Sequence, residues 1–397
     1  MKYILLAILL NITLAGFGQS HKNKLRTGAE QTECYIPYLQ NKKIGMVVNP
    51  TSIIGKQLSI DSLLARGIQI QKIFAPEHGF RGDFSNGAKV SDGIDPKTNI
   101  PIISLYGKHL KPTKNDLSGL DILVFDIQDV GARFYTYIST LHYVMEACAE
   151  NDIELLILDR PNPNGFYVDG PVLEPEFKSF VGMHPVPIVH GMTIGEYAQM
   201  INGEGWLANE ERCKLKIIKM ANYTHNMPYV LPIKPSPNLN TQQAIYLYPS
   251  LCLFEGTVIS QGRGTLFPFQ ILGSPALKGK YKFSFRPKSI PGMSESPLHQ
   301  NQDCFGIDLR KYPVNKIRQG GKLNLKWLME LYKAYPEKEK FFDAKQSPQI
   351  GNFDRLAGTA LLKQQIIAGK TEEEIRLSWE PALSQYKLMR KKYLLYP

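Results

Sequence analysis

Residues 121–133 read Asp-Ile-Leu-Val-Phe-Asp-Ile-Gln-Asp-Val-Gly-Ala-Arg, a short apolar run that passes at once into polar side chains. A run of this length is typical of a strand that is covered on both faces of a sheet. Behind it, residues 134–150 repeat apolar side chains at helical spacing, among them Ile138, Leu141 and Met145. Strand, polar turn and helix in this order are the repeating unit of an α/β fold.

The same unit recurs along the first half of the chain. Further apolar runs occupy residues 45–48, 68–74, 100–105 and 154–158, and residues 59–66 form a second helix candidate. Strands that alternate with helical segments predict parallel pairing. We therefore expect an α/β protein whose main sheet is doubly wound and mostly parallel.

A polar segment follows each apolar run at its carboxyl end. In an open parallel sheet these ends point the same way, and ligands bind in the crevice outside them. The sequence therefore predicts that five separate turns converge on one polar pocket. These turns are residues 49–52, 76–82, 106–107, 126–133 and 159–165.

The second half of the chain has a different character. Residues 229–264 are rich in Pro, Gly, Asn and Ser and are predicted to form long loops. Capping-box patterns predict helices that begin after Thr193 and after Thr371, and Pro381 suits the first turn of a final helix. We expect an extension at 19–40, a catalytic domain at 41–230, and a smaller α+β domain at 231–397 that closes an interdomain cleft.

The amino terminus predicts where the protein works. Lys2 precedes an apolar run at 4–16, and Gly16 and Gly18 supply small residues for cleavage, so residues 1–18 are interpreted as a signal peptide. The alternative is a retained membrane anchor. No other apolar run is long enough to span a bilayer, so we expect no stable membrane insertion and a periplasmic or secreted location.

Charge and cysteine content exclude some classes of partner. The chain has 47 Lys and Arg against 36 Asp and Glu, but the excess is spread along the sequence and matches no nucleic-acid-binding motif. Five cysteines without CxxC spacing argue against a zinc site. The sequence leaves open whether two of these cysteines form a disulfide.

Several catalytic classes lack their motifs. The first apolar run leads into residues 49–55, which do not match the dinucleotide pattern GxGxxG, so no cofactor is expected. The chain contains neither the serine hydrolase pattern GxSxG nor the zinc pattern HExxH. His142 and Glu146, four residues apart on one helix, keep a metal-dependent hydrolase open as an alternative.

Paired carboxyl groups fit the sequence better. Glu77, Asp126, Asp129 and Asp159 all follow predicted strands. Glycoside hydrolysis needs two such groups, one that protonates the leaving oxygen and one that attacks, stabilises or activates water. For Asp159 we favour a structural role, as a helix cap or as a partner of an arginine.

Several long segments in fixed order resemble the exo-β-N-acetylmuramidase (NamZ) family, long known only as a bacterial domain of unknown function. The likeness covers nearly all of the chain after about residue 40. The segments that carry it are residues 76–82, 126–137, 159–163, 235–238, 248–249, 255–257 and 262–269.

The resemblance implies a Rossmann-like domain, a smaller carboxyl-terminal domain, and release of N-acetylmuramic acid from the non-reducing end of peptidoglycan fragments. It implies Glu77 as the catalytic acid/base, and Asp129 and Asp126 as candidates for the second group. Because muramic acid carries a lactyl carboxylate and a sugar ring, arginine forks and aromatic rings suit it. The expected substrate-binding residues are His78, Arg81, Arg133, Tyr135, Tyr137, Arg160, Asn162, Asn238 and Arg263. A periplasmic muropeptide- or sugar-acid-binding protein without turnover, and a metal-dependent cell-wall amidase or esterase, remain as alternatives.

Overall fold

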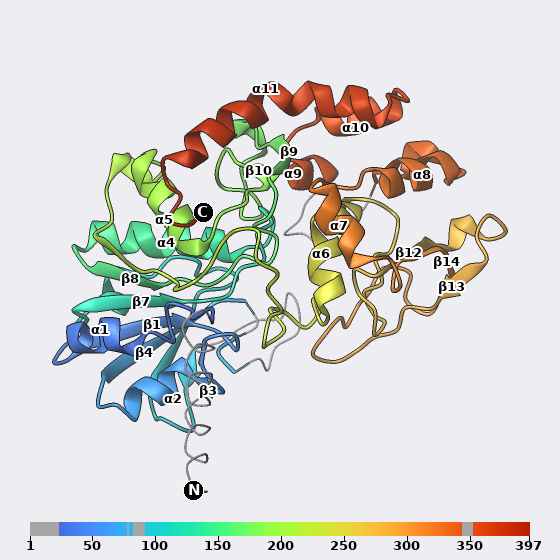
Figure 1. The fold of residues 1–397 in the computed structure, drawn as a ribbon. Helices are drawn as coiled ribbons and strands as arrows, with labels where there is room; N and C mark the ends of the chain where they lie inside the picture. The colour runs from blue at the N-terminus through green and yellow to red at the C-terminus, as the bar shows by residue number, and fades with distance from the viewer. Residues whose placement is uncertain (1–23, 78, 82–91, 344–351) are drawn as a thin grey trace, which may run out of the picture.

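The computed structural model describes residues 24–77, 79–81, 92–343 and 352–397. The predicted signal peptide and His78 lie outside the described residues. The rest forms a seven-stranded sheet with helices on both faces and a smaller part built around a three-stranded sheet (Figure 1). This confirms the predicted α/β class with a second, smaller domain.

The five predicted apolar runs all form strands of the main sheet, whose order is β11-β8-β7-β1-β4-β6-β5. Every pairing is parallel except that of the edge strand β5 with β6. The parallel strands therefore follow the Rossmann order: later strands are added on one side of β1 as far as β6 and then on its other side from β7 onward. Their bounds are β1 (Lys43–Val48), β4 (Gln69–Ala75), β5 (Gly93–Ile94), β6 (Pro101–Ser104), β7 (Ile122–Asp126), β8 (Glu154–Leu158) and β11 (Leu215–Ile218).

Alternation along the strands divides the core into two layers. In β1, Val47 packs in the cluster that contains the apolar residues of α4 (Tyr137–Glu150) and α5 (Ile194–Gly203). Its neighbour Val48 packs in the other cluster, with α1 (Thr32–Leu39) and α2 (Ser59–Leu64). Successive strand residues point to opposite faces, so both faces of the sheet are covered, as the continuous apolar runs predicted.

The second part is antiparallel. Its sheet has the order β12-β14-β13, formed by β12 (Ile271–Ser274), β13 (Phe283–Phe285) and β14 (Cys304–Asp308). Helices α7 (Val314–Gly320), α8 (Lys326–Ala334), α9 (Phe353–Ala357) and α10 (Leu361–Ile367) accompany it. The remaining elements are β2 (Ile53–Ile54), β3 (Gln57–Leu58), α3 (Lys114–Leu117), β9 (Asp169–Val172), β10 (Pro187–Val189) and the 3₁₀ turns η1 (Pro175–Phe177), η2 (Ala208–Glu210), η3 (Cys252–Gly256), η4 (Pro275–Leu277) and η5 (Lys338–Lys340).

Two predictions for the second half were wrong. The stretch 229–264 is not all loop, because Thr241 caps helix α6 (Gln242–Leu251), whose buried face outweighs its internal proline. Pro381 does not open a new helix but lies inside α11 (Glu372–Lys391). There, Ile375, Trp379 and Leu383 are buried at intervals of four residues, and this continuous apolar stripe holds one helix through the proline. The capping boxes at Thr193 and Thr371 are confirmed.

Helix α11 carries the chain from the second part back to the first (Figure 1). Its Tyr386 hydroxyl donates to the carbonyl of His190 at 2.8 Å. Beyond it, the Tyr396 hydroxyl donates to Asp159 at 2.6 Å, and the Leu395 N–H donates to Glu196 at 2.8 Å. The carboxyl-terminal tail thus packs on the main sheet domain. The boundary near residue 230 and the interdomain cleft stay predictions.

Within the described ranges, no helix combines the length and apolar character needed to cross a bilayer. All five cysteines are free thiols.

Candidate active site

The turns at the carboxyl ends of the central strands are bonded to one another. The N–H of Gln128, after β7, donates to Oγ1 of Thr51, after β1, at 3.1 Å. The Gln128 side chain donates to the carbonyl of Pro161, after β8, at 2.6 Å. The Asn164 side chain reaches back to the carbonyl of Val130 at 2.8 Å. The turns after β1, β7 and β8 therefore form one unit at the point where strand order reverses, which is where ligands bind in this fold.

Glu77 lies in the turn directly after β4 and is half-buried. Tyr106 follows β6, and its hydroxyl donates a hydrogen bond to Oε1 of Glu77 at 3.0 Å. On its other oxygen, Thr136 Oγ1 lies at 3.5 Å, the outer limit of a hydrogen bond. Side chains from the turns after β6 and β7 thus hold this carboxyl group, while the residue as a whole keeps part of its surface exposed.

Asp129 is a second carboxyl group in this region, and it is almost fully buried. Burial raises its pKa to about 7, although the N–H groups of Gly131 and Val130 favour the charged form. The Gly131 N–H donates to Oδ2 at 2.6 Å, while Oδ1 is buried without a hydrogen-bond partner in the described part of the chain. A pKa near neutrality leaves this carboxyl group partly protonated at pH ~7, and shifts of this kind are common among catalytic groups.

His190 faces Asp129 and was missed as a site residue. The Met192 N–H donates to its Nδ1 at 3.2 Å, so the ring proton lies on Nε2, 3.8 Å from Oδ2 of Asp129. Burial, together with the charges of Arg390 and Arg133, lowers the pKa of His190 to about 3, which keeps the ring neutral. The only sequence signal was a histidine after an apolar segment, and that pattern does not identify its partner.

Two tyrosines pack together near Glu77. The Tyr137 hydroxyl is 3.5 Å from the backbone oxygen of Glu77, and its ring packs edge-on against Tyr135 at 4.9 Å. Burial raises the pKa of Tyr137, and the charges of Glu77 and Asp129 add to the shift. Tyr137 is therefore close enough to Glu77 and to Asp129 for both charges to act on it.

Asp126 belongs to a different arrangement. It is fully buried, and its Oδ1 accepts from Nε of Arg160 at 2.7 Å, while Arg160 also donates to the carbonyl of Ile53 at 2.9 Å. These contacts give Asp126 and Arg160 a structural task, tying the turns after β7 and β8 to the segment after β1. Asp159 accepts from Tyr396, Thr193 and the N–H of Gly195, at the start of α5, which matches the expected capping role.

Two further predicted arginines are bonded to protein groups. Arg81 forms a bidentate pair with Asp95, with both contacts at 2.7 Å. Arg133 is fully buried and donates to the carbonyls of Pro171, Val186, Leu356 and Ala357 at 2.7–3.0 Å. Burial lowers its pKa to about 9. Arg133 therefore clamps the turn after β7 to helix α9 of the second part.

The predicted asparagines also make internal contacts. Asn162 donates to the carbonyl of Met192 at 2.9 Å and packs under Gly131, where a Cβ would lie 2.1 Å from its Oδ1. Gly131 also has φ of 79°, so only glycine suits the turn that carries Asp129. Asn238 donates to the carbonyl of Met293 at 2.8 Å, and its Oδ1 is buried without a partner among the described residues.

Arg263 is held in the second part by Glu255, which the sequence placed in a motif but not in the site. Nε of Arg263 donates to Oε1 of Glu255 at 2.5 Å, and the Gln261 side chain donates to the same oxygen at 2.9 Å. The Arg263 guanidinium lies over the ring of Phe269 at 5.2 Å.

Among the described residues, no group of three or more His, Cys, Asp or Glu side chains is arranged to hold a metal ion. His142 and Glu146 do approach each other, at 3.5 Å. His142 also contacts His184 at 3.0 Å, and Glu146 pairs with Lys111 at 2.7 Å. Burial lowers the pKa of His142 to about 4. These residues form a buried polar chain on α4.

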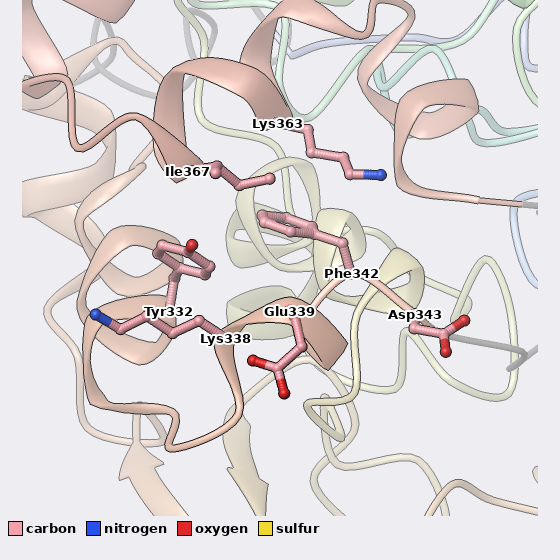
Figure 2. A pocket seen from close by; sticks show the side chains of 7 residues that line it. All are labelled: Tyr332, Lys338, Glu339, Phe342, Asp343, Lys363 and Ile367. Carbon is pink, nitrogen blue, oxygen red and sulfur yellow. The ribbon is translucent and has the colours of Figure 1, made fainter.

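A hollow of about 240 Å³ lies in the second part, between α8, η5 and α10 (Figure 2). Tyr332, Phe342 and Ile367 line it together with charged side chains, among them Lys338 and Lys363. None of the predicted site residues lines this hollow, so we do not assign the candidate active site to it.

Fold and site together define a two-domain α/β protein whose candidate carboxyl groups, Glu77 and Asp129, follow the central strands β4 and β7 of a Rossmann-ordered sheet. Family models agree: exo-β-N-acetylmuramidase NamZ, N-terminal, matches residues 44–243, and exo-β-N-acetylmuramidase NamZ, C-terminal, matches residues 246–396. The chain belongs to the NamZ family. A β-N-acetylmuramidase cleaves a glycosidic bond, so this family is one of glycosidases.

Individual relatives extend the comparison. The chain is 40% identical over 395 residues to peptidoglycan β-N-acetylmuramidase NamZ of Bacillus subtilis strain 168, covering 94% of this chain and 92% of that protein. A crystal structure of a DUF1343 family protein from Bacteroides fragilis NCTC 9343 is 45% identical, with a TM-score of 0.85, and covers 94% of this chain and 99% of its own. A second from the same organism is 29% identical, with a TM-score of 0.79, and covers 94% and 100%.

Proposed function

We propose that this protein is an exo-acting glycoside hydrolase that releases N-acetylmuramic acid from the non-reducing end of peptidoglycan fragments. Two observations support the proposal: the identity to a peptidoglycan β-N-acetylmuramidase along nearly the whole chain, and two carboxyl groups, Glu77 and Asp129, that follow central strands and both act on the pKa of Tyr137. The fragments that we expect as substrates are short chains of N-acetylmuramic acid and N-acetylglucosamine, and muropeptides.

Glu77 is the general acid/base in this proposal. The observation that carries it is its place: it is half-buried in the turn after β4, and Tyr106 orients its Oε1 at 3.0 Å. A carboxyl group that is oriented but still accessible can approach a bridging oxygen and give it a proton as the bond to the sugar breaks. Asp126, paired with Arg160 in the interior, lacks that access.

Asp129 is the second group. Its burial suits a side chain that orients the substrate or stabilises developing charge, rather than one exposed to bulk water. In one form of the mechanism the 2-acetamido group of the sugar attacks the anomeric carbon while Asp129 orients that amide. In the other, Asp129 serves as the direct partner carboxylate. NMR of the product distinguishes these routes by the configuration at the anomeric carbon. Inversion indicates direct displacement by water, whereas retention indicates attack first by the acetamido group or by a carboxylate.

Two other functions make different predictions for one experiment, in which the protein is incubated with defined muropeptides and the products are identified by mass spectrometry. A hydrolase of the proposed kind releases free N-acetylmuramic acid. A binding protein without turnover returns the fragments unchanged after hours. A metal-dependent amidase or esterase cleaves the peptide or an ester and loses activity with a chelator. We expect the protein to release N-acetylmuramic acid both with and without a chelator.

We also propose that the protein acts outside the cytoplasm, in the periplasm or as a secreted enzyme. The apolar run at 4–16, with Lys2 before it and small residues after it, supports this. Fractionation of cells, with amino-terminal sequencing of the mature chain, tests it. A chain that begins near residue 19 is expected, and an intact chain in the cytoplasmic fraction contradicts the proposal.

A further inference from the structure

Four arginines were candidates for binding the carboxylate of muramic acid, and their contacts distinguish them. Arg81 forms a bidentate ion pair with Asp95, and Arg160 is paired with Asp126 in the interior. Arg133 donates four hydrogen bonds to carbonyl oxygens and is fully enclosed. In Arg81 and Arg160 the Nε and Nη2 atoms are already bonded to protein groups, and in Arg133 both Nη atoms are.

Arg263 differs from these three. Glu255 occupies its Nε, while Nη1 is buried and has no hydrogen-bond partner in the described part of the chain. The side chain as a whole keeps 18% of its surface exposed. Burying a charged donor without an acceptor is costly, and native proteins rarely leave one unpaired. The open edge of this guanidinium is therefore suited to an acceptor that arrives from outside.

The acceptor for such an edge is a carboxylate. A guanidinium binds carboxylates through two parallel N–H groups, and Glu255 on the Nε side leaves the opposite edge unused. Next to it, Oε1 of Gln261 is also buried without a partner among the described residues. That oxygen can accept from a hydroxyl or amide N–H of the same ligand. Gln261 is anchored because its Nε2 donates to Glu255 at 2.9 Å.

Aromatic rings connect Arg263 to Glu77. The guanidinium lies over Phe269, whose ring packs edge-on against Tyr248 at 4.9 Å. Tyr248 in turn packs against Tyr135 at 5.9 Å, and Tyr135 contacts Tyr137 beside Glu77. A continuous series of packed rings thus runs from Arg263 in the second part to Tyr137 beside Glu77.

We propose that Arg263 is the specificity-determining residue that binds the lactyl carboxylate of the terminal N-acetylmuramic acid, with Gln261 beside it. This inference rests on the proposed function, since it names the group that recognises the substrate of the same site. It predicts that the enzyme distinguishes a free carboxylate at this position from a neutral group of similar size.

The test uses two aryl β-glycosides of N-acetylmuramic acid, one with the free lactyl carboxylate and one with its primary amide. Wild-type protein is expected to favour the acid at least about tenfold in kcat/KM. Arg263→Gln should lower kcat/KM for the acid by about 30- to 100-fold and change the value for the amide by less than about threefold. Equal losses on both glycosides, or no loss on either, overturn the proposal.

Controls separate recognition from folding. Arg286→Gln removes an exposed arginine that pairs with Asp303 in the same part, and it should leave the preference unchanged. Because Arg263→Gln leaves Glu255 buried without its partner, the double variant Glu255→Gln/Arg263→Gln removes both charges. It should also have lost the preference for the acid. A double variant that keeps the preference contradicts the assignment.

A binding measurement reads out Arg263 without hydrolysis. Titration calorimetry with N-acetylmuramic acid should show at least about tenfold weaker binding to Arg263→Gln than to wild type, while N-acetylglucosamine, which lacks the lactyl group, should not distinguish them. Unchanged affinity for N-acetylmuramic acid refutes the role of Arg263. Loss of affinity in a protein that cleaves neither glycoside supports this role and counts against the proposed hydrolase.

Discussion

The hydroxyl of Tyr106 donates a hydrogen bond to Oε1 of Glu77 at 3.0 Å, although the two residues follow different strands of the sheet. The bond orients one oxygen of the carboxyl group that we propose as the acid/base. Tyr106→Phe should lower kcat by about three- to tenfold with little change in KM, since a hydrogen bond of this kind contributes about 0.5–1.5 kcal/mol. Steady-state kinetics on an aryl β-N-acetylmuramide measures this.

The matched control is Tyr143→Phe, on α4, whose ring stacks with Phe180. Removing that hydroxyl should leave kcat unchanged. If both variants behave alike, the bond from Tyr106 does not orient a catalytic group.

Asp126 and Arg160 should matter for stability rather than for the chemical step. Both are buried, and the pair joins turns after β7 and β8. Asp126→Ala leaves the Arg160 charge without its partner, and we expect a loss of about 3–5 kcal/mol in the free energy of unfolding. Urea denaturation followed by circular dichroism measures the loss. A variant that is as stable as wild type but inactive would instead place Asp126 among the catalytic groups.

Asp129 should make stability depend on pH. Its pKa in the folded protein is about 7, above the roughly 3.9 of an unfolded chain, so the folded state binds this proton more tightly. The contribution of the neutral group to stability is fully present below pH ~4 and is lost as pH rises through ~7. Asp129→Asn keeps an acceptor for the Gly131 N–H and removes the titration.

Relative to Asp129→Asn, wild type should therefore be less stable at pH 8 than at pH 5, by on the order of 2–4 kcal/mol. Chemical denaturation of both proteins at the two pH values gives the difference. If the gap between the two proteins is the same at both pH values, Asp129 does not bind its proton in the manner described.

The sheet was predictable because each of its central strands is covered on both faces, and such strands leave continuous apolar runs in the sequence. The helices α4 and α5 were predictable from periodicity and from the Thr193 cap. Helix α6 was not, because it contains a proline and lies in a polar stretch, and burial together with the Thr241 cap holds it. The same is true of α11, where a buried stripe overrides Pro381.

The place of the candidate site followed from topology, since residues after neighbouring parallel strands meet at one edge. The hydrogen-bond partners of these residues could not be predicted from topology. Arg81, Arg133 and Arg160 look alike in sequence, and only the fold shows that their donors point to Asp95, to carbonyl oxygens and to Asp126. His190 and Glu255 were missed for the same reason: contacts across the chain leave no local pattern.

The central claim is that Glu77 gives the proton that breaks the bond to a terminal muramic acid. Wild type and Glu77→Gln should be incubated with a defined disaccharide that carries N-acetylmuramic acid at its non-reducing end, and release of the sugar followed by mass spectrometry. The control is Glu373→Gln, an exposed glutamate on α11. We predict release by wild type and the control, and a rate about 10²- to 10⁴-fold lower for Glu77→Gln at unchanged thermal stability. A rate for Glu77→Gln within a few-fold of wild type would contradict the account.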